Sequence, residues 1–190
     1  RMPLPKLIEL GITCLLHEIG QIRLPPQLYM TDRRLSPPER QKLATHSVLG
    51  YEIVKKNEFP LSVQIGVLEH HEREDGTGYP QKKKGDKISL YAKIIAVACT
   101  FEAITAPRHF KEARSTYEGM IEILKGNGKQ FDENVTKALL YSISLYPIGA
   151  YVYLSNGKIA QVTDVNPNDP KNPILQIFGE TLPDGSPKTV

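Results

Sequence analysis

The segment from Ile88 to Thr105 constrains the fold more than any other, because apolar residues lie on almost every side of it when it is drawn as a helix. These apolar residues include Ile94, Ile95, Val97, Ala98, Phe101 and Ile104. A helix that is hydrophobic all round is buried among other elements. The sequence therefore predicts a central helix that other helices surround.

Local signals predict the surrounding helices. Apolar residues recur at helical spacing from Leu4 to about Leu16, and this helix ends at His17-Glu18-Ile19-Gly20. Ser36, two prolines and Glu39 form a capped start, and the helix that follows carries His46 towards Val54. Further helices are predicted from Leu61 to Glu72, from a capped start at Ser115, and from Asp132 to about Tyr146.

The pattern changes after residue 146. Residues 151–154, 159–162 and 174–177 are strand-like, and the turn Ser155-Asn156-Gly157-Lys158 joins the first two as a hairpin. We therefore expect an all-α helical bundle over residues 1–146, followed by a small antiparallel β-meander over residues 147–190.

Composition excludes several classes of protein. With 190 residues, 40% of them hydrophobic and 24% charged, the chain is ordinary globular protein. The net charge of +3 is spread along the chain, which argues against DNA binding and permits an anionic ligand. The two cysteines, Cys14 and Cys99, are too few for a disulfide framework. No apolar run reaches the roughly 20 residues that a membrane-spanning helix needs. No signal-peptide pattern is present at the start of the chain. We expect a cytoplasmic protein that continues upstream of Arg1.

Histidines carry the candidate chemistry. Four of the five histidines lie at helix ends or on helical faces together with acids, as His17-Glu18, His46 and His70-His71-Glu72. A single histidine is more often a structural residue than a ligand. Two adjacent imidazoles at a helix end can reach one metal ion or two neighbouring ions, and a carboxylate can bridge them. The pattern predicts a divalent site with nitrogen and oxygen ligands, for iron, manganese or zinc.

Three blocks resemble, in order, the signature of HD-GYP domains, H-D-x-G-K, H-x-x-x-G and H-H-E-x-x-D-G-x-G-Y-P. They are His17-Glu18-Ile19-Gly20-Gln21, then His46 to Gly50, then His70 to Pro80, and the third block matches at every defined position. The resemblance covers roughly residues 4 to 146. It implies an HD-type bundle that holds one to three metal ions, which activate a water to hydrolyse cyclic di-GMP or a related dinucleotide.

The resemblance also assigns roles by position. His17, His46, His70 and His71 would be metal ligands, and Glu18 would replace a bridging Asp. The substrate would meet Gln21, Gly78, Tyr79, Pro80 and Arg108. No side chain is assigned as the catalytic group, because metal-bound water takes that part. Glu72 and Asp75 are interpreted as supporting or turn-stabilising groups, residues 82–84 as a solvated lysine loop, and His109 as a surface residue.

Three motif positions depart from the family. Glu18 replaces Asp, Gln21 replaces Lys, and Cys99 replaces a metal-binding Asp in the segment Val97-Ala98-Cys99-Thr100-Phe101-Glu102-Ala103. Cys99 is either a thiolate ligand for a softer ion or a small buried hydrophobe, and its apolar helix favours the second. Two functions stay open, a phosphodiesterase with an altered metal set and a signalling domain that binds metal, nucleotide or a protein partner with little or no hydrolysis. The sequence leaves a homodimer open as well.

Overall fold

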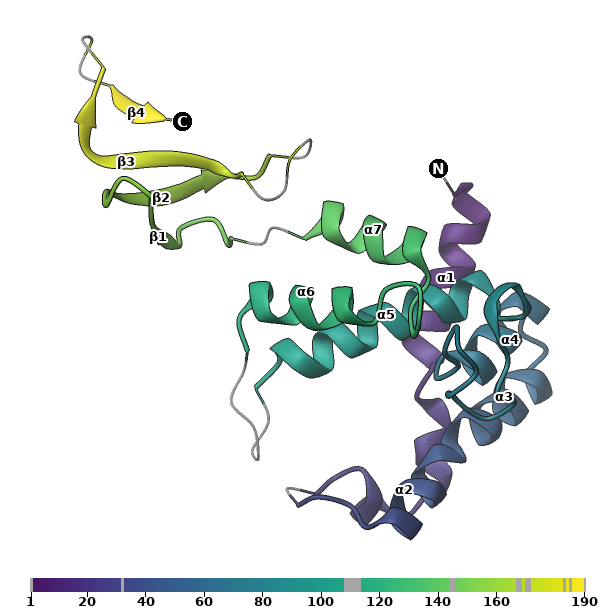
Figure 1. Ribbon diagram of the computed structural model, residues 1–190. Coiled ribbons are helices and arrows are strands. Elements are labelled where there is room, and N and C mark those ends of the chain that lie inside the picture. The colour runs from purple at the N-terminus through teal and green to yellow at the C-terminus, as the bar shows by residue number, and fades with distance from the viewer. Residues whose placement is uncertain are drawn as a thin grey trace.

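The computed structural model describes residues 2–31, 33–107, 114–143, 146–166, 169, 172–182, 184 and 186–189. A helical body is followed by a sheet that lies beyond the end of its last helix (Figure 1). The helices are α1 (Leu4–Leu16), α2 (Pro37–Ala44), α3 (His46–Lys56), α4 (Leu61–Glu69), α5 (Leu90–Thr105), α6 (Thr116–Lys125) and α7 (Glu133–Ser142). Short 3₁₀ helices are η1 (Ile19–Arg23), η2 (Pro26–Leu28) and η3 (Gly85–Lys87).

Side-chain caps fix the helix starts where the sequence predicts them. Ser36 and Glu39 form a complete capping box at α2, and Ser115 and Glu118 form another at α6. Asp132 caps α7 by accepting the Asn134 N–H at 2.9 Å. Because each cap satisfies backbone donors that the first turn leaves unpaired, these starts depend on local sequence alone.

Three predicted helices end elsewhere. The single helix predicted beyond Ser36 is interrupted at Thr45, whose hydroxyl donates to the Lys42 carbonyl at 2.7 Å, so that His46 begins a new helix. The next helix ends at Glu69 instead of Glu72, because the Glu72 N–H turns back to the Glu69 carbonyl at 2.7 Å. The last helix, α7, ends at Ser142, short of the predicted Tyr146.

The core has two parts joined by the contact between α4 and α5. One part contains Val54, Val63 and Val67 from α3 and α4, with α1 packed against it. The other contains Val97, Ile123, Phe131 and Val135 from α5, α6, α7 and the loop before α7. The predicted central helix is present as α5, which contributes residues to the core and contacts helices of both parts. Its fully buried residues lie between Tyr91 and Val97, whereas Ala98 is exposed and the second half of the helix is only partly buried.

The C-terminal strands form a four-stranded sheet in the order β1-β2-β3-β4, with every neighbouring pair antiparallel. The strands are β1 (Tyr151–Tyr153), β2 (Ile159–Asp164), β3 (Ile174–Thr181) and β4 (Pro187–Thr189). The predicted hairpin and meander are confirmed, and β4 is an addition. The description all-α therefore holds for the helical body and is too broad for the whole chain.

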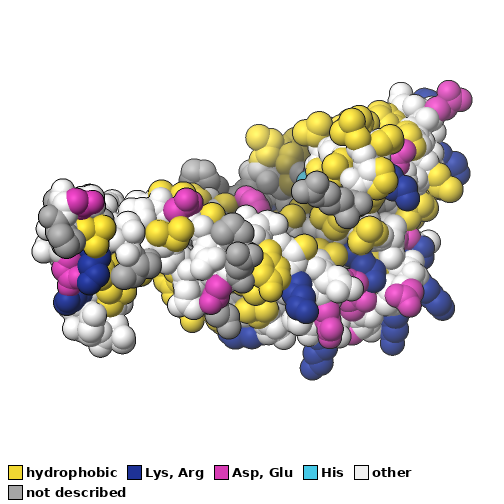
Figure 2. All heavy atoms as spheres, turned by 90° about the horizontal axis from the view of Figure 1, so that it is seen from above, with side chains coloured by type: hydrophobic (Ala, Val, Ile, Leu, Met, Phe, Trp, Pro, Cys, Tyr) yellow, Lys and Arg dark blue, Asp and Glu magenta, His cyan; other side chains and the backbone are white. Residues whose placement is uncertain are grey.

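The surface agrees with the predicted spread of charge. On the face seen in Figure 2, basic and acidic side chains alternate along the edge of the helical body, and only a small histidine surface is visible among other side chains. Within the described residues, no helix is both long and apolar enough to cross a membrane.

Candidate metal centre

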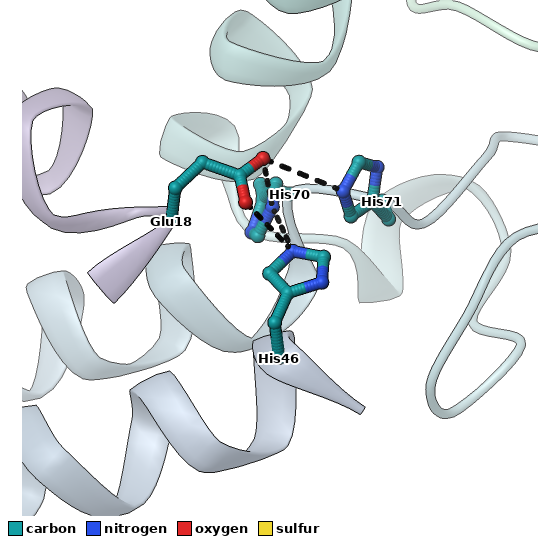
Figure 3. Close-up of side chains that lie close together, drawn as sticks. All are labelled: Glu18, His46, His70 and His71. Atoms are coloured by element: carbon teal, nitrogen blue, oxygen red, sulfur yellow. Dashed lines mark hydrogen bonds and ion pairs between the residues drawn. The ribbon is translucent and has the colours of Figure 1, made fainter. Parts of the chain in front are cut away.

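Helix ends bring four of the predicted ligands together. Glu18 follows the end of α1, His46 is the first residue of α3, and His70 and His71 follow the last residue of α4. Their ligand atoms all lie within 4.8 Å of one another, and Figure 3 shows the carboxylate and the three rings turned towards one another. We call these four residues the histidine–glutamate cluster.

Two glycines of the motifs let these ends approach. A Cβ atom at Gly20 would overlap the backbone of His46, so η1 lies directly against the start of α3. A Cβ atom at Gly50 would lie 3.0 Å from the Val67 side chain, so α3 lies close to α4. Larger residues at either position would separate the elements that carry Glu18, His46 and His70.

Backbone carbonyls set the tautomer of three rings. The Nδ1 atoms of His17, His46 and His70 lie 2.7, 2.8 and 2.8 Å from the carbonyl oxygens of Cys14, Leu43 and Val67. Because a carbonyl only accepts, each Nδ1 is the N–H donor, and each neutral ring keeps its lone pair on Nε2. The Nε2 atoms of His46 and His70 are therefore presented to the cluster as electron-pair donors.

The resulting arrangement suits a cation. The two Nε2 atoms of His46 and His70 are 3.2 Å apart, and a Glu18 oxygen lies 3.3 Å from that of His46. The other Glu18 oxygen lies 3.9 Å from His70 Nε2 and 4.0 Å from His71 Nε2. Lone pairs that face each other without a proton repel, and a metal ion between them removes the repulsion. The residues therefore fit a divalent ion with nitrogen and oxygen ligands.

Burial keeps two of the rings neutral. His70 is 1% exposed, and burial, with the neighbouring His71, lowers its pKa well below the ordinary value. Burial also lowers the pKa of His71 to about 3, and charges on His46 and Arg73 act in the same direction. A neutral imidazole is the form that binds a metal, so both rings are ready ligands at neutral pH.

His17 is turned to a different neighbour. Its Nε2 lies 3.3 Å from the Cys99 sulfur and 3.8 Å from a Glu18 oxygen. Burial and, to a smaller extent, the charge of Glu18 raise the pKa of Cys99 to about 11. The thiol is therefore protonated at neutral pH, and its S–H donates to the His17 lone pair. The structure thus brings His17 beside the histidine–glutamate cluster, paired with Cys99.

Residues 1–135 match the HD domain family. The chain belongs to this family. The resemblance to HD-GYP domains that the motifs predict is confirmed, because the similar curated proteins are cyclic dinucleotide phosphodiesterases. The family is one of metal-dependent phosphohydrolases, in agreement with the predicted dependence on a divalent ion.

Two relatives illustrate the similarity of this HD domain. A cyclic di-GMP phosphodiesterase of Pseudomonas aeruginosa is 31% identical over 178 residues, 93% of this chain and 43% of that protein. A cyclic di-GMP phosphodiesterase of Borreliella burgdorferi is 29% identical over 170 residues, 90% of this chain and 45% of that protein. The chain thus spans less than half the length of these relatives.

A solved structure supports the fold. The cyclic GMP-AMP specific phosphodiesterase of Vibrio cholerae superposes with a TM-score of 0.57 at 21% identity, over 73% of this chain and 38% of that one. At this identity the likeness establishes the fold of the HD domain and nothing about its substrate.

Three of the predicted substrate residues, Gln21, Gly78 and Tyr79, lie next to residues of the cluster. The Tyr79 ring stacks on His71 with centroids 4.7 Å apart, and Gly78 is so close to residues 71–73 that a Cβ atom would overlap their backbone. Pro80 follows in the same loop and is half-buried. The Gln21 amide donates to the Glu18 carboxylate. Arg108 and His109 lie outside the described residues.

Sequence reasoning missed a polar network behind the HD domain's histidine pair. Glu69 and Glu72 are each 1% exposed. Glu72 accepts the Gln81 and Lys83 N–H groups at 2.6 and 3.0 Å, while Glu69 accepts the Ser89 N–H at 2.8 Å and pairs with the Lys83 ammonium. The interpretation of residues 82–84 as a solvated loop is therefore wrong for Lys83. A charged residue inside the apolar run before His70 was the available signal.

The supporting roles interpreted for Glu72 and Asp75 agree with the structure. Glu72 holds the loop after Pro80, as described above, and the Asp75 carboxylate accepts the Thr77 N–H at 2.9 Å and the Thr77 hydroxyl at 2.6 Å. Both carboxylates are thus engaged by the loop between the histidine pair and α5.

Proposed function

We propose that this HD domain binds a divalent metal ion through Glu18, His46, His70 and His71, binds a cyclic dinucleotide beside that ion, and hydrolyses it weakly or not at all. The observation that carries the proposal is the convergence of four ligand atoms within 4.8 Å. The Nε2 lone pairs of His46 and His70 and the Glu18 carboxylate face one another in this set, which is the environment that a cation needs.

The donor set favours iron, manganese or zinc, because imidazole and carboxylate suit these ions. When bound, such an ion supplies Lewis-acid stabilisation of phosphoryl oxygens and lowers the pKa of water. Glu18 holds its place by accepting the Gln21 amide, and the carbonyls behind His46 and His70 hold those rings. The residues thus orient one another before any ligand arrives.

The substrate class is cyclic di-GMP or a related dinucleotide. Relatives carry this activity in their names, some of them for cyclic di-GMP and others for 3′3′-cGAMP. Tyr79 lies at the edge of the cluster, where its ring can contact a base, and Gly78 and Pro80 shape the loop around it. Arg108 is proposed as a phosphate contact on the resemblance alone.

Three residues support weak hydrolysis. Glu18 has one methylene more than Asp, which moves its carboxylate by about a bond length. Gln21 is neutral and its amide is engaged with Glu18, so it gives a phosphate no positive charge. Cys99 donates its thiol to His17, which occupies the lone pair that a second ion would need.

The second candidate is an active phosphodiesterase with an altered metal set. It is favoured by the position of Glu18, one oxygen of which lies within 4.0 Å of the Nε2 atoms of His17, His70 and His71. A carboxylate at that place can bridge two ions, one near His17 and Cys99 and the other in the cluster.

Turnover distinguishes these candidates. In the full-length protein, the variant Glu18→Asp, Gln21→Lys, Cys99→Asp is expected to hydrolyse cyclic di-GMP at least about tenfold faster than the unmodified protein, a factor worth about 1.4 kcal/mol in the transition state. The measurement is product formation by chromatography, after metal analysis has shown at least one equivalent of ion in both proteins. Equal and substantial rates would establish the active candidate, and a protein without metal would refute the proposal.

A further inference from the structure

Arg73 is a half-buried cation without an acidic partner, at the edge of the histidine–glutamate cluster. Among the described residues no carboxylate lies within ion-pair distance of its guanidinium. The three nearest acids in sequence are engaged elsewhere. Glu72 accepts the N–H groups of Gln81 and Lys83, Glu74 pairs with the Lys93 ammonium at 3.1 Å, and Asp75 accepts the N–H and the hydroxyl of Thr77. A partly desolvated guanidinium with no anion is costly unless a ligand supplies the charge.

The guanidinium is held in a fixed orientation. It lies over the Phe131 ring, 5.3 Å from the centroid, while Nη1 donates to the Glu72 carbonyl at 3.1 Å and Nη2 to the Thr100 hydroxyl at 3.4 Å. The neighbouring Glu74 N–H is bonded to the Gln130 carbonyl at 3.2 Å, which anchors the segment. A cation fixed in this way loses little freedom when it binds an anion.

Some N–H groups of the Arg73 guanidinium have no hydrogen-bond acceptor. A guanidinium has five N–H groups, and only the two bonds above engage them within the described part of the chain. Among the described residues, Thr136 Oγ1 is the one fully buried side-chain nitrogen or oxygen atom that lacks a hydrogen-bond partner. The Nε of Arg73 also lacks a partner, so it is not fully buried and solvent reaches it. The Nε–H group is therefore accessible to a ligand.

Arg73 lies beside the site. It follows the ligand His71 by two residues, and its Nη2 donates to the hydroxyl of Thr100, the neighbour of Cys99 on α5. The Cys99 sulfur in turn lies 3.3 Å from His17 Nε2. The guanidinium is thus near the part of the site where His17 and Cys99 meet.

We infer that Arg73 binds a phosphate oxygen of the substrate and positions it beside the metal ion. The inference rests on the proposed function, because it takes the ligand to be a phosphodiester. A planar guanidinium with free N–H groups suits two oxygens of one phosphate, whereas the Glu18 carboxylate repels one. Arg73 gives the HD domain a positive charge beside the site, which the neutral Gln21 does not supply.

Calorimetric titration tests the inference. The full-length protein is loaded with Mn²⁺ and titrated with a phosphorothioate analogue of cyclic di-GMP that resists hydrolysis, and in a second arm with inorganic phosphate. Arg73→Gln is expected to weaken binding of the analogue about tenfold or more, the loss typical of a charge-assisted hydrogen bond, and Arg73→Lys less. Arg40→Gln, which removes the same charge from the exposed face of α2, leaves affinity unchanged.

A structural role for Arg73 makes a different prediction. If Arg73 only supports Phe131, then Phe131→Leu, which keeps the guanidinium and removes the ring, reduces affinity as much as Arg73→Gln does, and this result overturns the inference. Unchanged affinity in Arg73→Gln with full metal content also overturns it and leaves the proposed function standing. Failure of the unmodified, metal-loaded protein to bind the analogue refutes both. Where Arg73→Gln does not fold, Arg73→Lys and Phe131→Leu decide.

Discussion

Single atoms decide what the candidate centre can hold. His17, His46 and His70 each bond through Nδ1 to the carbonyl three residues earlier, so each helix end orients its own ring. Partners of this kind are common behind metal-binding histidines, where they fix the tautomer. Only His46 and His70 direct the remaining lone pair at the cluster, since that of His17 meets Cys99.

Substitutions at this scale separate ligands from neighbours. His46→Gln is expected to weaken metal binding by at least about tenfold, because it removes an imidazole lone pair from the set of four. Cys99→Ala leaves the first equivalent of metal bound, because Cys99 contacts His17 and lies outside that set. Competition with a chelating dye measures both affinities. A large loss in Cys99→Ala would place the thiolate among the ligands.

The stability of the metal-free protein should depend on pH. The pKa of His71 is about 3 in the folded protein, below its ordinary 6.5, so the unfolded chain binds the proton first as pH falls. Stability is therefore complete above pH 6.5 and decreases towards pH 3, by up to about 1.4 kcal/mol per pH unit for this group. Between pH 6.5 and pH 5 the expected loss is about 2 kcal/mol.

Urea unfolding after chelator treatment checks this dependence. His71→Gln should show a shallower decrease than the unmodified protein over the same range, since the variant cannot take up that proton. A decrease of equal slope in both proteins would mean that His71 does not cause it. His70, whose pKa is also lowered by burial, contributes to the slope that remains.

Secondary-structure elements show where sequence reasoning succeeds. The helix starts at Ser36 and Ser115 are predictable because helix caps depend on local sequence. The helix α5 is predictable because apolar side chains lie on most of its sides. The break between α2 and α3 at Thr45 and the presence of strand β4 could not be predicted from the sequence. The break comes from one hydroxyl bond to the preceding turn, and β4 has only a short register with β3, from Thr181 opposite Pro187 to Gln176 opposite Thr189.

In the candidate site too, features set by local sequence are predictable and those set by contacts between distant residues are not. Its histidines are predictable from ordered motifs, whereas the pairing of Glu69 with Lys83 joins residues from α4 and a distant part of the following loop. Nothing in the spacing of the lysine run distinguishes Lys83 from Lys82 or Lys84. Only the packed loop shows which of the three turns inwards.

The loop between the histidine pair and α5 should depend on that ion pair. Lys83→Met is expected to destabilise the protein by about 2–3 kcal/mol, less than for a fully buried pair because the Lys83 side chain is 30% exposed while that of Glu69 is 1% exposed. The loss arises because Glu69 remains as a buried carboxylate without its cation. Unfolding in urea measures it, with Lys82→Met, at an exposed position, as the control.

A double variant sharpens this test. Glu69→Gln combined with Lys83→Met should recover a large part of the loss, because the amide carries no charge that needs a partner and can still accept the Ser89 N–H. Additive losses in the two single variants would show that Glu69 and Lys83 act independently.

The whole molecule has a helical body and a sheet that meet at one connection (Figure 1). All the residues of the histidine–glutamate cluster lie in the helical body, and both parts of the core belong to it as well. The sheet carries an exposed aromatic surface of its own, with Tyr151 and Phe178 rings 5.6 Å apart. These observations favour the predicted division of the chain after residue 146.

Truncation tests that division. A chain ending at Tyr146 is expected to keep its helical circular dichroism and the metal affinity of the longer chain, and to unfold within a few degrees of it. The reason is that the truncation removes none of the residues in the two core clusters. A truncated chain that aggregates or loses the metal would show that the sheet is part of the domain.

The four residues of the histidine–glutamate cluster, at positions 18, 46, 70 and 71, all lie in the first half of the chain. The connections that must close to assemble it are short, so the entropy lost in closing them is small. During synthesis from the N-terminus, α1, α3 and α4 leave the ribosome before α5, α6, α7 and the sheet have been made. A nascent chain therefore presents all four ligands before the elements that follow α4 have been made.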